Sequence, residues 1–100
     1  MNNPLRILEE KHVIDILFFL MNRDHCMKSD IYKNVSTNSR MPVKLDMMEK
    51  EGLINQSVDT FKNNTTTVSL TPKGRIIAET LVEVGQIMID QGEFEGDEIS

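Results

Sequence analysis

Side chains that can hydrogen-bond to the edges of DNA bases stand close together in the middle of the chain. A recognition helix needs short polar or basic side chains in its first turn, where they reach base edges, and its free N–H groups can hold phosphates. The same side chains also serve as helix caps and as ordinary surface polarity, so they indicate DNA binding only if the surrounding elements fit. These residues are Thr37, Asn38, Ser39, Arg40 and Lys44.

Two short helices separated by a turn are predicted around these residues. The first spans Lys28–Asn34, and Ser36 to Asn38 are good caps for a following helix because their side-chain oxygens accept hydrogen bonds from free N–H groups. Pro42 is compatible only with a first turn, so the second helix begins between Asn38 and Met41. Gly52 ends it, because glycine adopts the left-handed conformation at no steric cost.

The second helix is expected to present one face to the core and another to solvent. The spacing predicts buried positions at Leu45, at Met48 and at either Met41 or Val43. The side chains expected to project outward are Arg40, Lys44 and Met47.

A polar hairpin follows, with a first strand from Leu53 to about Thr60 and a β-branched return strand at Thr65–Leu70. The loop Phe61–Asn64 joins them, and Asn tolerates the positive φ of a tight turn. At its tip Lys62 could bind a phosphate and Asn63 could reach the minor groove, although a plain solvated hairpin fits equally well.

The order helix, turn, helix, hairpin predicts an α+β fold, a winged helix-turn-helix. Its parts are a three-helix core, a two-stranded β-wing and a C-terminal dimerisation helix. The opening helix covers Leu5–Met21, with a break or bend around Glu9 to His12.

Thr71 and Pro72 are a cap and first-turn pair for the last helix, whose apolar face is wider than packing within one small domain requires. A homodimer would cover this face; alternatively, Leu5–Met21 of the same chain covers it. Residues 1–92 are expected to form the domain, and the acidic residues 93–100 a disordered tail. The predicted dimer contacts are Leu5, Leu8, Ile77, Leu81, Val84 and Met88.

The net charge of −5 conceals an asymmetry along the chain. All 11 basic residues lie at or before Arg75, against nine acids, and the other seven acids follow it. Between Arg23 and Lys44 five bases face two acids, so the surface presented to a duplex can be positive although the whole chain is acidic. The predicted phosphate ligands are Lys28, Lys33, Lys44 and Lys62.

Cys26, the single cysteine, cannot form an intrachain disulfide. It is interpreted as a small buried hydrophobe, with a redox sensor as the alternative because Arg23 and Lys28 nearby would lower its pKa.

The composition fits one soluble domain, and no motif for catalysis is present. We expect no enzyme activity, no cofactor, no metal site, no membrane span and a cytoplasmic location; a small-molecule effector is not specified.

Several segments resemble the HxlR-type branch of the winged-helix regulators, which are relatives of the MarR family. Residues 7–17 resemble that family's opening helix, with Lys11-His12 where a Lys-Trp pair usually stands. Residues 39–54 resemble its recognition helix and exit, and residues 68–74 the close of its wing. The resemblance implies a homodimer held by terminal helices, with two recognition helices in successive major grooves of double-stranded DNA.

Two hypotheses of different classes follow. The first is a homodimeric, sequence-specific transcriptional regulator that inserts the Asn38 to Lys44 helix into the major groove. The second is a winged helix used for protein–protein interaction, which the acidic balance and the nearly uncharged hairpin would suit.

Overall fold

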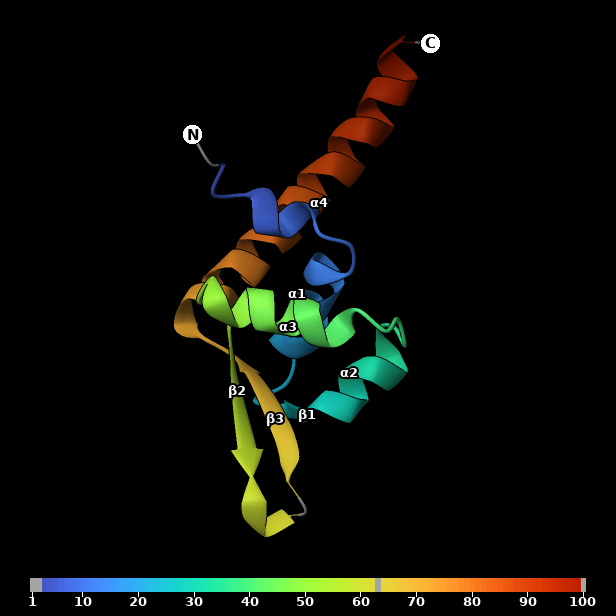
Figure 1. Ribbon diagram of the computed structural model, residues 1–100. Coiled ribbons are helices and arrows are strands. Elements are labelled where there is room, and N and C mark those ends of the chain that lie inside the picture. The colour runs from blue at the N-terminus through green and yellow to red at the C-terminus, as the bar shows by residue number, and fades with distance from the viewer. Residues whose placement is uncertain (1–2, 63, 100) are drawn as a thin grey trace.

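The computed structural model describes residues 3–62 and 64–99, and the side chains of these residues except Lys62 and 91–99 (Figure 1). Helices and a small sheet follow one another in the predicted order. In chain order they are the 3-10 helix η1 (Arg6–Glu9), α1 (Val13–Met21), β1 (Cys26–Met27), α2 (Lys28–Asn34), α3 (Met41–Lys50), β2 (Ile54–Asp59), the 3-10 turn η2 (Thr60–Lys62), β3 (Thr65–Leu70) and α4 (Pro72–Ile99).

The opening segment breaks where the sequence predicted. His12 has φ of +75°, a left-handed conformation that no regular helix accommodates, and it separates η1 from α1. In α1 the residues Val13, Ile16, Leu17 and Leu20 recur at three- and four-residue spacing and are buried. The break therefore lets the lead-in turn away while α1 enters the core.

The sheet has three antiparallel strands in the order β1-β3-β2. The wing strands β2 and β3 pair from Ile54↔Leu70 to Asp59↔Thr65, as expected for a hairpin. The prediction of two strands was nevertheless incomplete, because β1 pairs with β3 through Cys26↔Val68. Two residues are too few to show an alternating pattern, and this pairing depends on a contact with a strand 42 residues later.

A compact junction joins the end of α3 to the start of α4. Gly52 has φ of +81° and ends α3, as predicted. The Thr71 hydroxyl donates to the Gly52 carbonyl oxygen at 2.6 Å and accepts from the Gly74 N–H at 2.9 Å, so it also caps α4. Gly74 is buried against the backbone of Leu53, and this close approach has no room for a side chain.

One core holds the helices against the sheet. Of the two positions that the sequence left open, Met41 is buried and Val43 is exposed, and the predicted burial of Leu45 and Met48 is confirmed. Arg75 Nη1 donates to the Met21 carbonyl oxygen at 3.1 Å and fixes α4 on the end of α1. The buried apolar residues are Val13, Ile16, Leu17, Leu20, Cys26, Ile31, Met41, Leu45, Met48, Leu53, Ile54, Val68 and Ala78.

Helix α4 extends far beyond the body of the molecule, on the opposite side from the wing (Figure 1). Its backbone continues through residues 93–99, where the sequence favoured a disordered tail. This stretch contains no proline and is rich in glutamate, which is compatible with helix. Among the described residues, no helix is both long enough and apolar enough to cross a membrane.

Candidate nucleic-acid interface

The turn between α2 and α3 is ordered by its own side chains. Ser36 Oγ accepts from the Asn38 N–H at 3.0 Å, and Asn38 Oδ1 accepts from the Arg40 N–H at 2.8 Å. These local bonds are typical of Ser and Asn in turns. The second bond uses only the oxygen of the Asn38 amide, so the NH₂ group remains available to a ligand.

Helix α3 begins at Met41, the latest start that the sequence allowed, with Arg40 at its N-cap and Pro42 in its first turn. Of the start positions that the sequence left open, the structure therefore has the last, and Asn38 to Arg40 precede the helix. Thr37, Asn38 and Ser39 lie in the turn, and they are exposed together with Arg40. The turn brings these four predicted contacts together at the amino-terminal end of α3.

Lys44 does not project outward as predicted. Its relative exposure is only 8%, and its Nζ lies 3.7 Å from Glu10 Oε1 in the lead-in to α1. Position 44 is one turn from the buried Met41 and Met48, so its stem crosses the buried side of the helix. Lys44 is therefore a structural ion-pair partner in this arrangement and not a surface cation.

The outward face of α3 carries other residues, which the sequence analysis missed. Val43, Asp46 and Lys50 recur at spacings of three and four and are exposed, Val43 by 48%. Met47, predicted to project outward, is half-buried. The spacing of Val43, Asp46 and Lys50 could have predicted this face, but Val43 was treated only as a candidate for burial.

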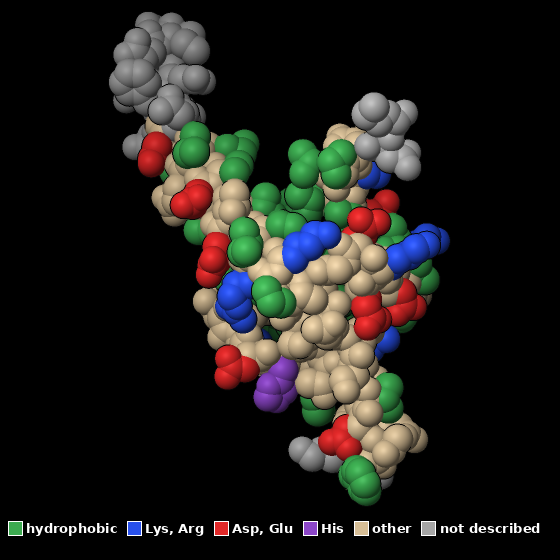
Figure 2. Space-filling model, turned by 90° about the vertical axis from the view of Figure 1, so that its left-hand side faces the viewer, with side chains coloured by type: hydrophobic (Ala, Val, Ile, Leu, Met, Phe, Trp, Pro, Cys, Tyr) green, Lys and Arg blue, Asp and Glu red, His purple; other side chains and the backbone are tan. Residues whose placement is uncertain are grey.

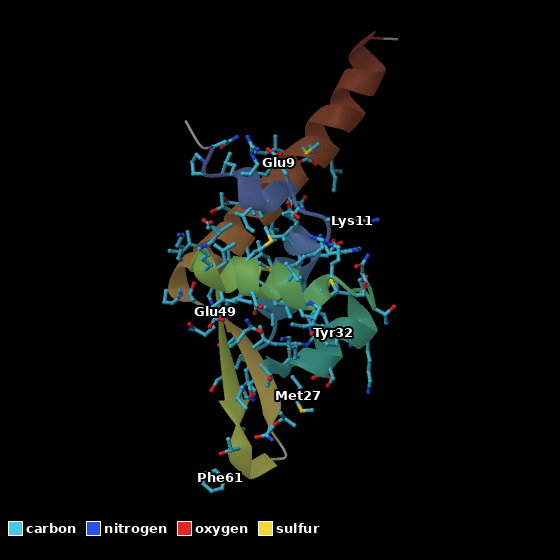
Figure 3. The ribbon with its side chains drawn as sticks, viewed as in Figure 1. Glu9, Lys11, Met27, Tyr32, Glu49 and Phe61 are labelled. Carbon is cyan, nitrogen blue, oxygen red and sulfur yellow. The ribbon has the colours of Figure 1, made fainter. Side chains whose placement is uncertain are left out.

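Two carboxylates on α3 are held by one glutamine of the wing. Gln56 Nε2 donates to Asp46 Oδ1 at 3.0 Å and to Glu49 Oε1 at 2.9 Å. The Gln56 backbone N–H also donates to Glu49 Oε2 at 3.2 Å. Glu49 thus lies where α3 meets the root of the wing (Figure 3), and together with Asp46 it makes the side of α3 that contacts Gln56 acidic.

Three of the five predicted bases between Arg23 and Lys44 remain on the surface without a close partner among the described residues. Lys33 and Arg40 are exposed, and Lys28 is half-buried at the start of α2. The Arg23 guanidinium instead stacks 3.8 Å from the Phe19 ring centroid and donates to the Phe19 carbonyl oxygen at 2.7 Å. Arg23 is nevertheless exposed, so Lys44 is the one base of the five that is removed from the surface.

The tip of the wing presents an aromatic ring. Phe61 is 98% exposed, and Asn64 beside it has φ of +59°. Of the two predicted contacts there, Asn63 lies outside the described residues, as does the side chain of Lys62. Phe61 was not among the predicted contacts, because one aromatic in a polar hairpin shows no periodicity.

The predicted dimer contacts divide into two groups. Leu8, Ile77 and Leu81 are partly buried against the core of their own chain. Leu5, Val84 and Met88 are exposed, Met88 by 70%. Figure 2 shows apolar side chains gathered on the outer part of α4 and on the N-terminal segment, with a hollow between them. Further exposed apolar residues of α4 are Ile76, Val82, Ile87 and Ile89.

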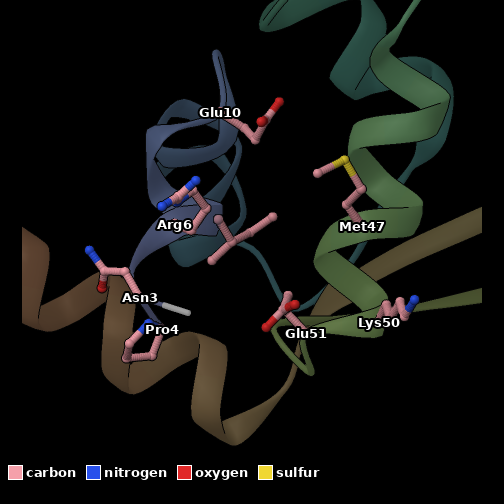
Figure 4. Close-up of a pocket in the computed structure, with 8 residues that line it drawn as sticks. Asn3, Pro4, Arg6, Glu10, Met47, Lys50 and Glu51 are labelled. Carbon is pink, nitrogen blue, oxygen red and sulfur yellow. The ribbon is translucent and has the colours of Figure 1, made fainter. Parts of the chain in front are cut away.

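A cavity of about 580 Å³ separates the N-terminal lead-in from the carboxyl half of α3 (Figure 4). Arg6 and Lys50 line it together with Glu10 and Glu51, so its charges are balanced and favour neither anions nor cations. Asn3, Pro4, Ile7 and Met47 complete the lining.

Cys26 is only 7% exposed and packs in the core, as its interpretation as a buried hydrophobe requires. Burial raises the pKa of its thiol, Asp30 adds to that rise, and Arg23 opposes it. The expectation of a lowered pKa was therefore wrong, because desolvation outweighs the nearby positive charge. Within the described residues, no group of three or more His, Cys, Asp or Glu side chains could hold a metal ion.

No protein-family model and no curated protein matches the chain. Several solved structures are similar to the chain. A transcriptional regulator homologue from Pyrococcus horikoshii superimposes with a TM-score of 0.77 at 23% identity, over 86% of this chain and 87% of that one. MepR of S. aureus, in a complex with DNA, gives a TM-score of 0.74 at 19% identity, over 96% of this chain and 81% of that one.

A MarR family transcriptional regulator from Silicibacter pomeroyi gives a TM-score of 0.67 at 26% identity, over 87% of this chain and 62% of that one. The chain therefore has the winged-helix fold of MarR-like regulators. This agrees with the fold and the resemblance inferred from the sequence.

Proposed function

We propose that this winged-helix chain is a sequence-specific DNA-binding transcriptional regulator that acts as a homodimer, with α3 in the major groove. The observation that carries the proposal is the exposed turn at the amino-terminal end of α3, where Arg40 stands at the N-cap beside three polar residues. The likeness to MepR, solved in a complex with DNA, supports the same use of this fold.

Arg40 is the first choice for a base contact, because a guanidinium can donate two parallel bonds to O6 and N7 of guanine. Ser39, Asn38 and Thr37 would contact neighbouring base edges or phosphates from the turn. Val43 adds an apolar side chain on the outward face of α3, where it could contact the methyl group of thymine.

Phosphate contacts are assigned to Lys33 and Lys28 on α2, and Lys50 on α3 joins them because it is exposed. Lys62 and Asn63 at the wing tip are retained from the sequence analysis. Lys44 is left out, since its charge is engaged by Glu10. Each phosphate contact contributes roughly 0.9 to the slope of log affinity against log salt concentration.

The homodimer is proposed from the apolar side chains that α4 exposes. Val84, Met88 and their neighbours on α4 face solvent, as does Leu5, and an exposed apolar surface of this kind is usually covered by a partner. Sedimentation over a range of concentrations tests this assembly. Met88→Glu should shift the chain toward monomer, and an unchanged dimer would contradict the proposed interface.

Selection of duplexes from a random pool tests the function as a whole. We expect enriched sequences with two half-sites related by a two-fold axis and spaced by about one helical turn, roughly 10 base pairs. Arg40→Ala should enrich a more degenerate set. A pool that gains no common sequence would contradict sequence-specific binding.

A protein-interaction module is the second candidate, and Asp46 and Glu49 favour it. These carboxylates, held by Gln56, place negative charge where α3 faces the wing, and this charge would repel phosphates. This alternative predicts no salt-sensitive binding to duplexes, together with capture of a basic protein partner that Glu49→Gln weakens.

A further inference from the structure

Phe61 occupies the end of the wing and is 98% exposed, the highest exposure among the large hydrophobic side chains that the structure describes. Figure 3 shows its ring extending from the tip, away from the rest of the molecule. The outer part of α4 extends away from the body on the side opposite the wing (Figure 1), so an interface formed by that part of α4 does not account for Phe61.

The backbone at the tip is held in a defined turn. Asp59 Oδ1 accepts from the Phe61 N–H at 2.9 Å, and Asp59 is itself the last residue of β2 paired with β3. The turn η2 follows, and Asn64 with φ of +59° returns the chain into β3. On its β2 side Phe61 therefore follows a hydrogen-bonded strand end, which lowers the conformational entropy lost on binding.

The wing is long enough to bring this ring to the next groove of a duplex that holds α3. Six residues of extended strand span roughly 20 Å. Half of a helical repeat of B-DNA, the offset between neighbouring major and minor grooves, is roughly 17 Å. A wing rooted beside α3 can therefore place its tip at the adjacent minor groove.

The described part of the wing carries little charge. Asp59 is the only charged side chain among those the structure describes in residues 54–61 and 64–70. Phe61 is the most exposed apolar side chain there, so the described tip offers an aromatic ring to a ligand. Apolar side chains in minor-groove proteins act as wedges that enter between base pairs and partly unstack them.

We propose that Phe61 is such a wedge, inserted from the minor groove into a base step of the duplex whose major groove holds α3. The proposal rests on the proposed function and adds a second, shape-dependent determinant of the preferred sequence. Pyrimidine–purine steps such as TA and CA unstack most easily. The preferred duplex therefore carries one of these steps beneath the wing, at a position that α3 does not contact.

A tryptophan at this position gives a direct test, because the chain has no tryptophan of its own. Phe61→Trp is titrated with a selected duplex that carries a fluorescent end label, so that anisotropy reports binding and indole emission reports the tip. Stacking on bases should quench the indole with the same midpoint as the anisotropy change. Binding with unchanged indole emission would overturn the wedge and leave the proposed function standing.

Two other outcomes also overturn the wedge. No anisotropy change at low salt would mean that the chain does not bind the duplex, and the proposed function would then fail together with the wedge. If, without DNA, the indole emission of Phe61→Trp shifts to the blue as the protein concentration rises, the tip instead contacts another copy of the chain.

Affinity and DNA shape provide an independent measurement. Phe61→Ala should weaken binding about tenfold or more, which is the range for loss of one stacking side chain. It should also reduce bending, measured by energy transfer between labels at the two duplex ends. Val58→Ala is the matched control, because it removes an exposed apolar side chain from the neighbouring strand and should change neither quantity. Equal affinity and bending in Phe61→Ala would contradict the proposal.

Discussion

Lys44 Nζ lies 3.7 Å from Glu10 Oε1, and this pair joins the middle of α3 to the segment that precedes α1. The side chain of Lys44 is 10% exposed and that of Glu10 is 43% exposed, so the lysine bears most of the desolvation. Glu10 also lines the cavity between the lead-in and α3. The pair therefore couples the lead-in to the helix proposed to enter the major groove.

Removing one partner of this pair should lower the free energy of unfolding more than replacing the lysine by an apolar side chain does. Glu10→Gln leaves Lys44 largely buried without its countercharge, and we expect about 1–3 kcal/mol of destabilisation. Lys44→Met keeps the unbranched apolar stem and removes the charged group, so its free energy of unfolding should stay near that of the parent. Urea denaturation of both variants checks this order, and a reversed order would contradict it.

Lys33 and Lys44 should differ in their effect on salt-dependent DNA binding. Lys33 is exposed on α2, and Lys33→Ala should lower the slope of log affinity against log salt by roughly 0.9. Lys44→Met should leave the slope unchanged, since its charge is buried beside Glu10. The slopes come from titrations at several salt concentrations. If Lys44→Met lowers the slope of log affinity against log salt, Lys44 contacts a phosphate after all.

The junction between α3 and α4 should tolerate no side chain at Gly74. A Cβ there would lie 2.0 Å from the Leu53 carbonyl oxygen, so backbone would have to move. We expect Gly74→Ala to destabilise the fold by about 1–3 kcal/mol or more. Thermal denaturation measures the effect.

Gly85→Ala is the matched control in the same helix. A Cβ at Gly85 meets nothing within 4 Å, and alanine is the better helix former by about 0.5–1 kcal/mol. The two substitutions should therefore change stability in opposite directions. Equal effects would show that the contact with Leu53 does not constrain the junction.

The stability contributed by Cys26 should decline at alkaline pH. Burial raises the pKa of its thiol in the folded chain above the ordinary value of 9.0. Below that value both states keep the proton and the contribution is complete; as pH rises, the unfolded chain releases its proton first and the contribution is lost. The destabilisation caused by Cys26→Ala should thus be smaller at about pH 10 than at about pH 8, by urea denaturation. If Cys26→Ala destabilises the fold equally at both pH values, the raised pKa is contradicted.

Local signals were sufficient to predict most elements from the sequence. Gly52, the Thr71-Pro72 pair and the break before Val13 each act through backbone preferences that do not depend on distant residues. The bounds of α2 and β3 agree with the prediction for the same reason. The fold class followed from the order of these elements.

The remaining features depend on contacts between distant segments. β1 exists because Cys26 meets Val68, and the charge of Lys44 is paired because Glu10 lies beside it. The desolvation that raises the pKa of Cys26 likewise arises only when the core closes over it. A pattern within one segment cannot specify these relationships, so the predicted site was correct in its region and wrong in part of its membership.

Arg40, in the turn before α3, is the residue proposed to read the DNA sequence. The most direct test is fluorescence anisotropy of a selected duplex and a scrambled duplex, at low and moderate salt, with Arg40→Ala and the exposed Lys11→Ala as a charge control. We predict salt-sensitive binding that prefers the selected duplex, a preference reduced about tenfold or more by Arg40→Ala alone. No binding at low salt, or an unchanged preference in Arg40→Ala, would contradict this account.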